Sequence, residues 1–116
     1  MIRMKKLILS IAVLIGWMVW MTSMKPHNLV ASWYDAPGGT MANGKIFDGE
    51  AYTCATRDWP LGTKLLITSG RRVIRVTVTD RINKRFAGKR IDLTPAAFEK
   101  LAPLDQGLVN VKVARR

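Results

Sequence analysis

The chain of 116 residues contains one cysteine, Cys54, and one histidine, His27. A single cysteine excludes an intramolecular disulfide, so a small domain has to be stable without one. A lone histidine, far in sequence from the cysteine, provides neither a metal-ligand set nor a Ser-His-Asp arrangement. We therefore expect no metal and no cofactor. Cys54 itself is expected to be a small buried hydrophobic side chain.

Acidic residues are few, since 8 Asp and Glu stand against 19 Lys and Arg. From Asn28 onward the balance is 15 basic to 8 acidic side chains, a net charge of +7. This excess favours a polyanionic partner such as the bacterial cell wall or anionic lipid. Nucleic acid is not expected, because there is no basic helix and no motif of interleaved aromatic residues for stacking on bases.

Residues 7–24 contain no charged side chain and follow Arg3, Lys5 and Lys6. A positive segment followed by an apolar one is typical of an export signal, yet the run also approaches the roughly 18 to 20 residues that span a bilayer. The sequence therefore predicts an apolar helix in residues 1–27 that is either a signal peptide or an uncleaved membrane anchor. Residues 28–116 are expected in the periplasm or outside the cell, because positive charges stay in the cytoplasm. No cysteine follows the run that could carry a lipid.

The remainder of the chain is mainly β. Alternating apolar residues predict strands at 29–34, 51–56 and 108–114, and a hairpin over 63–80 that turns at Ser69 and Gly70. On the second arm of the hairpin, Ile74, Val76 and Val78 are expected in the core, and Arg75, Thr77 and Thr79 on the opposite face. The glycine-rich segment 35–50 predicts a long loop.

One short helix is expected after Asp92, where Thr94 is a suitable N-cap and Pro95 a suitable first helical residue. Six or so short strands, one helix and no repeats predict a small barrel closed on itself, without exposed edges. We expect it to be a monomer.

Five segments resemble one known family: ASWYD, MANGKIFD, YTCATRDWPLGTKLLI, RVTVTDR and GKRIDLTPAAFEKLA. In this order and at about this spacing they are similar to the double-psi β-barrel domain of the rare lipoprotein A family, which are septal-ring lytic transglycosylases of bacteria. The resemblance extends over nearly all of residues 29–114. Expansins and barwin-like proteins share the barrel, so fold alone does not settle activity.

The resemblance implies a peptidoglycan lyase in which Asp80 is the catalytic acid and base and Asp92 supports it. A lytic transglycosylase forms an anhydro sugar without water, so one carboxyl group can serve in both roles, unlike the carboxylate pair of ordinary glycosidases. Asp80 ends a strand with core-facing alternate residues, so we expect its carboxyl at the mouth of the barrel. As substrate-binding residues we expect Tyr34, Asn43, Lys45, Asp48 and Arg81.

After Asp80 and Arg81 the family's Gly-Pro turn is replaced by Ile82 and Asn83. Two polar positions of the expected site also depart from the family pattern. Lys45 stands where the family usually has glutamate, and Thr56 stands where it has histidine. A lysine beside Asp80 would favour the ionised carboxylate, which is the wrong form for a general acid. Asp48 or Glu50 on the same loop could restore a carboxylate near Asp80.

Alternatives to the enzyme remain open at this point. Asp80 could bond to Arg81, Arg90 or loop amides and so stabilise the barrel, and Asp92 could accept hydrogen bonds from nearby backbone N–H groups. The protein would then be an expansin-like module that binds peptidoglycan strands without cutting them. Lys45 discriminates the two, because a Lys45–Asp80 pair favours the binder.

The aromatic side chains add little. Trp33 and Tyr34 alternate, so one should face the core and the other a cleft in which a ring can stack on sugar. Trp59, followed by Pro60, is expected to fill a turn.

Overall fold

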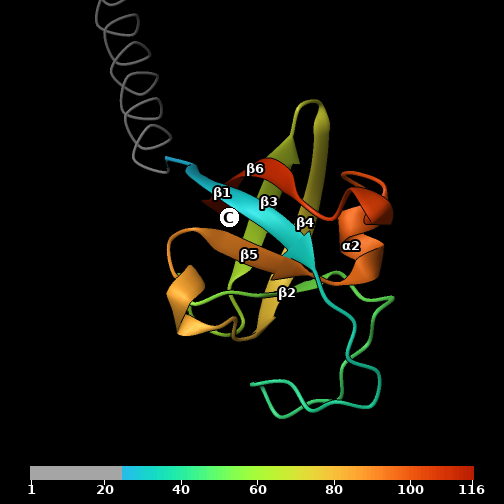
Figure 1. Cartoon of the computed structure of the whole chain (residues 1–116). Helices are drawn as coiled ribbons and strands as arrows, with labels where there is room; N and C mark the ends of the chain where they lie inside the picture. The colour runs from blue at the N-terminus through green and yellow to red at the C-terminus, as the bar shows by residue number, and fades with distance from the viewer. Residues whose placement is uncertain (1–24) are drawn as a thin grey trace, which may run out of the picture.

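The computed structural model describes residues 25–116, which form a closed six-stranded barrel (Figure 1). Residues 1–24 of the predicted signal or anchor segment, 1–27, lie outside the described residues. The predicted fold class of the barrel is confirmed. Its strands are β1 (His27–Trp33), β2 (Thr53–Ala55), β3 (Lys64–Ser69), β4 (Arg72–Asp80), β5 (Arg90–Leu93) and β6 (Val109–Arg115). The helical elements are η1 (Lys84–Phe86), α2 (Pro95–Glu99) and η2 (Leu104–Gln106).

The strands follow the order β1-β5-β2-β4-β3-β6 around the barrel. Two pairings are parallel, β1 with β5 and β2 with β4, and the others are antiparallel. Because strands far apart in sequence pair in this way, the ends of β4 and β5 flank β2, and the end of β1 lies beside β5. This arrangement positions the candidate site.

The core fills the barrel with the inward-facing side chains of every strand. The expected face of the second hairpin arm is confirmed, since Ile74, Val76 and Val78 are all buried. Cys54 is fully buried, as the sequence predicts, and burial raises the pKa of its thiol to about 12. Trp59 is also buried in this core, with its ring 5.2 Å from that of His27. It has no ring face free for a sugar.

Two local predictions are confirmed in detail. The β3–β4 hairpin turns at Gly70, whose φ of 59° is a left-handed conformation that glycine adopts without strain. Thr94 caps α2 by accepting a hydrogen bond from the N–H of Ala97, and Pro95 is the first helical residue. The hydroxyl of Thr94 in turn donates to the carbonyl of Ala51 at 2.6 Å, which ties α2 to the segment before β2.

Thr79 is an exception to the predicted alternation. It was expected on the polar face of β4, but it is buried and its hydroxyl lies 3.3 Å from the sulfur of Met41. The cause is a bulge, because Cys54 pairs with Val78 and the next residue, Ala55, pairs with Asp80. A bulge interrupts the alternation and redirects the side chains beyond it.

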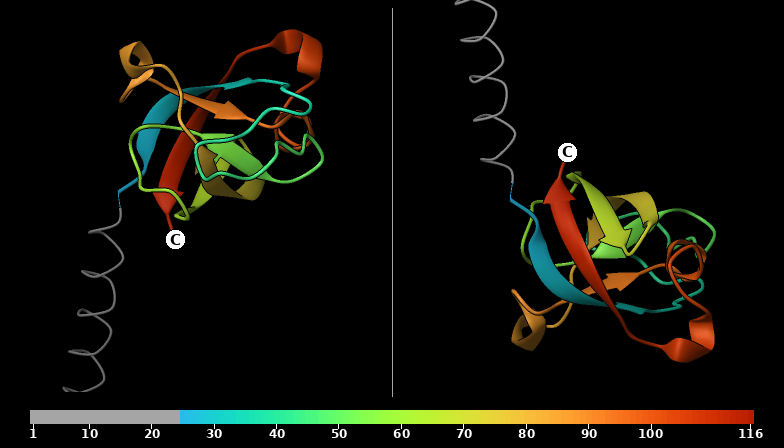
Figure 2. Two further views of the ribbon diagram at one scale, coloured as in Figure 1. Left: turned by 90° about the horizontal axis from the view of Figure 1, so that it is seen from below. Right: turned by 90° about the horizontal axis from the view of Figure 1, so that it is seen from above.

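The loop between β1 and β2 lies at the end of the barrel away from the β3–β4 hairpin tip (Figure 1). The start of β1 and the end of β6 lie side by side, with His27 paired to Val113, and both are remote from that loop (Figure 2). Among the described residues, no helix has the length and apolar character needed to cross a membrane.

Candidate functional site

Asp80 and Asp92 occupy equivalent levels on the two strands that flank β2. Ala55 of β2 pairs with Asp80 on one side and with Asp92 on the other. Since neighbouring strands are about 4.8 Å apart, the two Cα atoms are separated by roughly 10 Å. The row continues to Ser32 of β1, which pairs with Asp92. The two predicted acids therefore belong to one surface at the end of the barrel.

The carboxylate of Asp80 accepts three hydrogen bonds. Its Oδ1 atom accepts from the backbone N–H groups of Ala42 and Arg81, both at 2.9 Å. Its Oδ2 atom accepts from the hydroxyl of Tyr34 at 3.1 Å. Two fixed amides thus occupy Oδ1, and Oδ2 is the oxygen with room for a further partner.

Asp92 has a simpler environment. Its Oδ1 atom accepts a hydrogen bond from the hydroxyl of Ser32 across the β1–β5 pair. The prediction that backbone N–H groups near the start of α2 bind this carboxylate is therefore wrong, because Thr94 takes that capping role. Both aspartates are partly exposed.

Tyr34 connects Asp80 to the loop. Its hydroxyl donates to Asp80, and its ring lies 5.0 Å from the ring of Phe47. Burial raises the pKa of Tyr34 well above its ordinary value, and the Asp80 carboxylate raises it further, with a smaller effect from Asp92. Tyr34 therefore stays protonated at neutral pH and remains a donor. Trp33 points the other way, against the core, and its indole N–H donates to the carbonyl of Leu104.

The loop of residues 35–50 is held to the end of β4. The N–H of Asn43 donates to the carbonyl of Thr79 at 3.1 Å. This bond lies next to the one from the N–H of Ala42 to the Asp80 carboxylate. Within the loop, the side chain of Asn43 accepts from the N–H of Lys45, and that of Asp48 accepts from the N–H of Glu50. Asn43 and Asp48 thus shape the loop's own turns.

Lys45 does not pair with Asp80. Its side chain is exposed, and in the described part of the chain no side-chain nitrogen of a Lys or Arg lies within 4.0 Å of an Asp80 carboxylate oxygen. Neither Asp48 nor Glu50 makes a hydrogen bond to Asp80. Of the two arrangements expected from the sequence, a lysine pair or a replacement carboxylate, the structure has neither.

Arg81 acts within the fold. Its Nη1 atom donates to the carbonyls of Thr56 and Trp59, both at 2.7 Å. Thr56 is buried, and its hydroxyl accepts from the N–H of Asp58. The guanidinium that was expected to bind substrate therefore clamps the turn after β2, and the position of the family's histidine is occupied by a buried threonine.

Sequence reasoning missed two contributors to the site. Ser32 lies two residues before Tyr34 on the same strand face, so the period of two could have found it. The backbone N–H of Ala42 leaves no mark in the sequence, because any residue other than proline supplies that donor.

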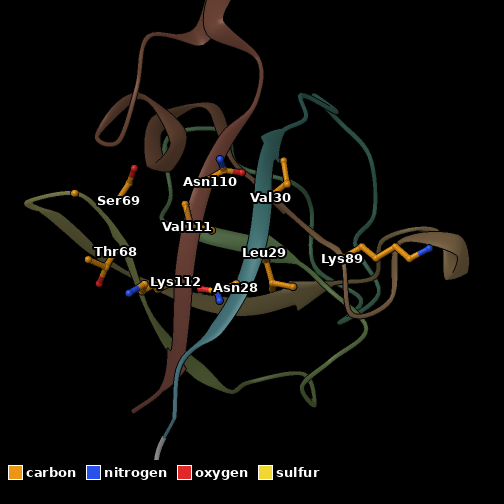
Figure 3. Close-up of a pocket in the computed structure, with 10 residues that line it drawn as sticks. Asn28, Leu29, Val30, Thr68, Ser69, Lys89, Asn110, Val111 and Lys112 are labelled. Atoms are coloured by element: carbon orange, nitrogen blue, oxygen red, sulfur yellow. The ribbon is translucent and has the colours of Figure 1, made fainter.

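A different part of the surface holds the hollow drawn in Figure 3, of about 600 Å³. It runs along β1, β3 and β6, with Asn28, Thr68, Asn110 and Lys112 among its lining residues. No Asp or Glu lines it. Acid–base chemistry on a sugar ordinarily uses carboxyl groups. We therefore assign the candidate site to Asp80, Asp92 and Ser32, which we call the aspartate row, and not to this hollow.

Comparison with known proteins gives the family. The family model described as "Lytic transglycolase", a double-psi β-barrel domain, matches residues 27–113. The chain belongs to this family. It is similar to an uncharacterized Synechocystis protein, ssl3177, with 35% identity over 80 residues, 67% of this chain and 83% of the relative. It is also similar to the endolytic peptidoglycan transglycosylase RlpA of Neisseria meningitidis serogroup A, with 34% identity over 88 residues.

The match to Neisseria RlpA covers 72% of this chain but 36% of that protein, and the match to Treponema pallidum RlpA covers 24%. This chain thus corresponds to one domain of those longer relatives. Among solved structures, the Streptomyces papain inhibitor aligns with a TM-score of 0.63 and 28% identity, over 79% of this chain and 91% of that one. The apo expansin of Clavibacter michiganensis aligns with a TM-score of 0.64 and 21% identity, over 78% and 50%. The latter likeness concerns the fold alone.

Proposed function

We propose that this protein is an endolytic peptidoglycan lytic transglycosylase that cleaves glycan strands and leaves anhydro-muramyl ends. The observation that carries the proposal is the pair of carboxylates on either side of Ala55 at the barrel end, of which Asp80 is bonded to Tyr34 and to the loop. Membership of a family with relatives named for this activity supports it.

The reaction assigns Asp80 both proton transfers. Oδ2 is the oxygen that would carry the proton, since Oδ1 already accepts from two backbone amides. The proton passes to the glycosidic oxygen and the bond from that oxygen to the anomeric carbon breaks. The 6-hydroxyl of the same sugar bonds to that carbon and returns its proton to Asp80. Because the 6-hydroxyl is the nucleophile, the reaction needs neither water nor a second, nucleophilic carboxylate.

The remaining side chains support this step. Asp92 adds negative charge to the surface on which positive charge develops at the sugar ring. Tyr34 keeps its proton and so fixes the orientation of the Asp80 carboxylate by donating to it. Lys45 and Asn43 lie on the loop that borders this surface, where the exposed Lys45 ammonium and the half-buried Asn43 amide can meet a glycan.

A second candidate is a wall-binding module of expansin type that does not cleave. It is favoured by the three hydrogen bonds to Asp80, because a carboxylate that anchors a loop can be retained for stability alone. The replacement of the family's glutamate and histidine by Lys45 and the buried Thr56 points the same way.

Product analysis separates the two candidates. The chain is incubated with purified, peptide-free glycan strands, and the products are examined by mass spectrometry. Anhydro ends that appear with the wild type and are lost in Asp80→Asn support the lyase. Reducing ends would indicate a hydrolase instead. Strand binding without products at high protein concentration would establish the binder and refute the enzyme.

We also propose that the protein is exported and that residues 7–24 hold it at the outer face of the inner membrane. The uncharged run after Arg3, Lys5 and Lys6 is the support for this. Mass measurement of the chain recovered from membranes tests it, since cleavage before Lys25 would contradict an anchor.

A further inference from the structure

Four cationic side chains line one hollow on the barrel wall. Lys64 begins β3, Arg75 lies within β4, and Arg115 and Arg116 end the chain. The hollow measures about 460 Å³, and its other lining residues are Gly62 and Thr63. β-Pairing builds this cluster, because Leu66 of β3 pairs with both Arg75 and Ala114, and the N–H of Arg116 donates to the carbonyl of Lys64 at 3.1 Å. We call these four residues the basic cluster.

No Asp or Glu side chain of the described residues pairs with the basic cluster. The hollow has no Asp or Glu in its lining, and no carboxylate of the described residues lies within 4.0 Å of its four cationic groups. All four side chains are exposed. Like charges gathered in one place repel each other and attract anions, and the planar guanidinium of arginine is well suited to phosphate. The chemistry of the hollow therefore fits a phosphate-bearing partner.

The basic cluster lies where the described chain begins. β6 runs antiparallel to β1, with Asn28 opposite Lys112 and His27 opposite Val113. The same register brings Arg115 level with Lys25, which is exposed. Figure 3 shows the end of β6 beside the start of β1. Only Lys25 and Pro26 separate β1 from the uncharged run of residues 7–24, and two extended residues span about 7 Å.

We propose that the basic cluster, together with Lys25, contacts the anionic phospholipid headgroups of the membrane that holds residues 7–24. This inference rests on the proposed anchor and is independent of strand cleavage. Attraction to an anionic bilayer acts within a Debye length, about 8 Å at physiological salt. The two-residue connection keeps the start of β1 inside that range, and Arg115 lies beside it at the end of β6. The β1–β2 loop lies at the far end of the barrel (Figure 2), so this contact turns the aspartate row toward the wall.

Hydrogen exchange on the full chain in lipid nanodiscs tests the contact. Discs of phosphatidylcholine alone are compared with discs that contain phosphatidylglycerol, and exchange is followed in residues 62–66 and 113–116. We expect exchange in both segments to slow by about fivefold or more in the anionic discs, and the difference to disappear at high salt. Equal exchange in the two kinds of disc would overturn the proposal.

Charge variants locate the effect. Arg75→Gln with Arg115→Gln removes two cluster charges and is expected to abolish the protection by phosphatidylglycerol. Arg71→Gln with Lys89→Gln removes the same charge from exposed positions outside the hollow and should retain it. All four changes are on exposed side chains, and melting curves check that both variants fold. Loss of protection in both variants alike would contradict a local contact.

Two further arms identify the partner. Inorganic phosphate added to phosphatidylcholine discs should leave exchange unchanged, and protection by phosphate alone would show a small-anion site and refute lipid docking. Soluble wall fragments that protect more strongly than phosphatidylglycerol would likewise refute it. If the chain does not remain with the discs, both the proposed anchor and this inference are refuted. The proposed lyase activity is tested separately, by the product assay.

Discussion

Asp80 and Asp92 flank the same residue, Ala55, yet their carboxylates have different partners. The Asp80 carboxylate accepts hydrogen bonds from two backbone N–H groups and from the Tyr34 hydroxyl, and so joins β4 to the loop after β1. The Asp92 carboxylate accepts a hydrogen bond from the hydroxyl of Ser32 on the neighbouring strand. A carboxylate that is held by several fixed donors is well oriented for proton transfer, but it is also part of the fold. Stability and activity must therefore be measured separately for each aspartate.

Removal of each carboxylate should separate their structural roles first. We expect Asp80→Ala to lower the free energy of unfolding by about 2 to 3 kcal/mol, because three charge-assisted hydrogen bonds are lost. Asp92→Ala should cost about 1 kcal/mol, since one hydroxyl loses its acceptor. Denaturant unfolding measures both, and hydrogen exchange should show faster exchange at Ala42 only in Asp80→Ala. Equal costs would mean that the two carboxylates have similar structural roles.

Arg81 offers a test of whether the residue after Asp80 serves the fold or the substrate. Arg81→Gln should lower the free energy of unfolding by about 1.5 to 3 kcal/mol, because the carbonyls of Thr56 and Trp59 lose a charged donor. Arg75→Gln, on an exposed side chain of β4, is the matched control and should be close to wild type. Unchanged stability with weakened strand binding would instead assign Arg81 to the substrate.

Alkaline pH should weaken the protein through Tyr34 and Cys54. Burial raises the pKa of the Cys54 thiol from 9.0 to about 12, and it also raises the pKa of Tyr34. The folded chain holds these protons more tightly, so the unfolded chain releases them first as pH rises. The contribution of Cys54 is fully present below about pH 9 and is lost between pH 9 and about 12. The contribution of Tyr34 is fully present below about pH 10 and is lost as the pH rises above that value.

Denaturant unfolding at pH 8 and pH 10.5 measures this loss. The double variant Cys54→Ala with Tyr34→Phe is less stable at pH 8 but should lose less stability over the same interval. An identical loss in the variant and the wild type would show that neither group is responsible.

Lys45 should have the smallest effect, on binding alone. Its backbone forms the loop turn, with its N–H donating to Asn43 and its carbonyl accepting from Met41, so Lys45→Glu leaves the turn intact. We expect strands, which carry lactyl carboxylates, to bind about two- to fivefold more weakly at low salt and equally at high salt. Lys89→Glu makes the same change of charge away from the aspartate row. An equal loss in both variants would indicate net charge and not a local contact.

Much of the fold follows from local rules in the sequence. The hairpin at Gly70, the Thr94–Pro95 helix start and the inward face of β4 are consequences of backbone preference and the period of two. Boundaries shifted slightly, since β2 is Thr53–Ala55 and not the predicted 51–56. The site was less accessible to prediction. Its geometry depends on the parallel β2–β4 pairing, on the bulge after Cys54 and on the N–H of Ala42, and none of these leaves a residue-specific pattern.

The family resemblance identified Asp80 and Asp92 but not their contacts. Substrate binding by Arg81 stays a prediction, and the structure shows that its guanidinium clamps the turn at Thr56 and Trp59. The resemblance also raised the question of a Lys45–Asp80 pair, which is absent from the described residues. Side-chain partners across a barrel depend on strand register, and register between strands distant in sequence is a property of the folded chain.

The most direct test of the central claim is a count of the anhydro ends that wild type, Asp80→Asn and Asp92→Asn produce from the same glycan strands. Protein concentrations are chosen so that each variant binds the same fraction of the strands. Asparagine keeps an oxygen that can accept from Ala42 and Arg81, so the loop should stay in place. We predict that Asp80→Asn forms anhydro ends at least about 100-fold more slowly than wild type, and that Asp92→Asn retains intermediate activity. Wild-type rates in Asp80→Asn, or equal losses in the two variants, would contradict the assignment of Asp80 as the acid.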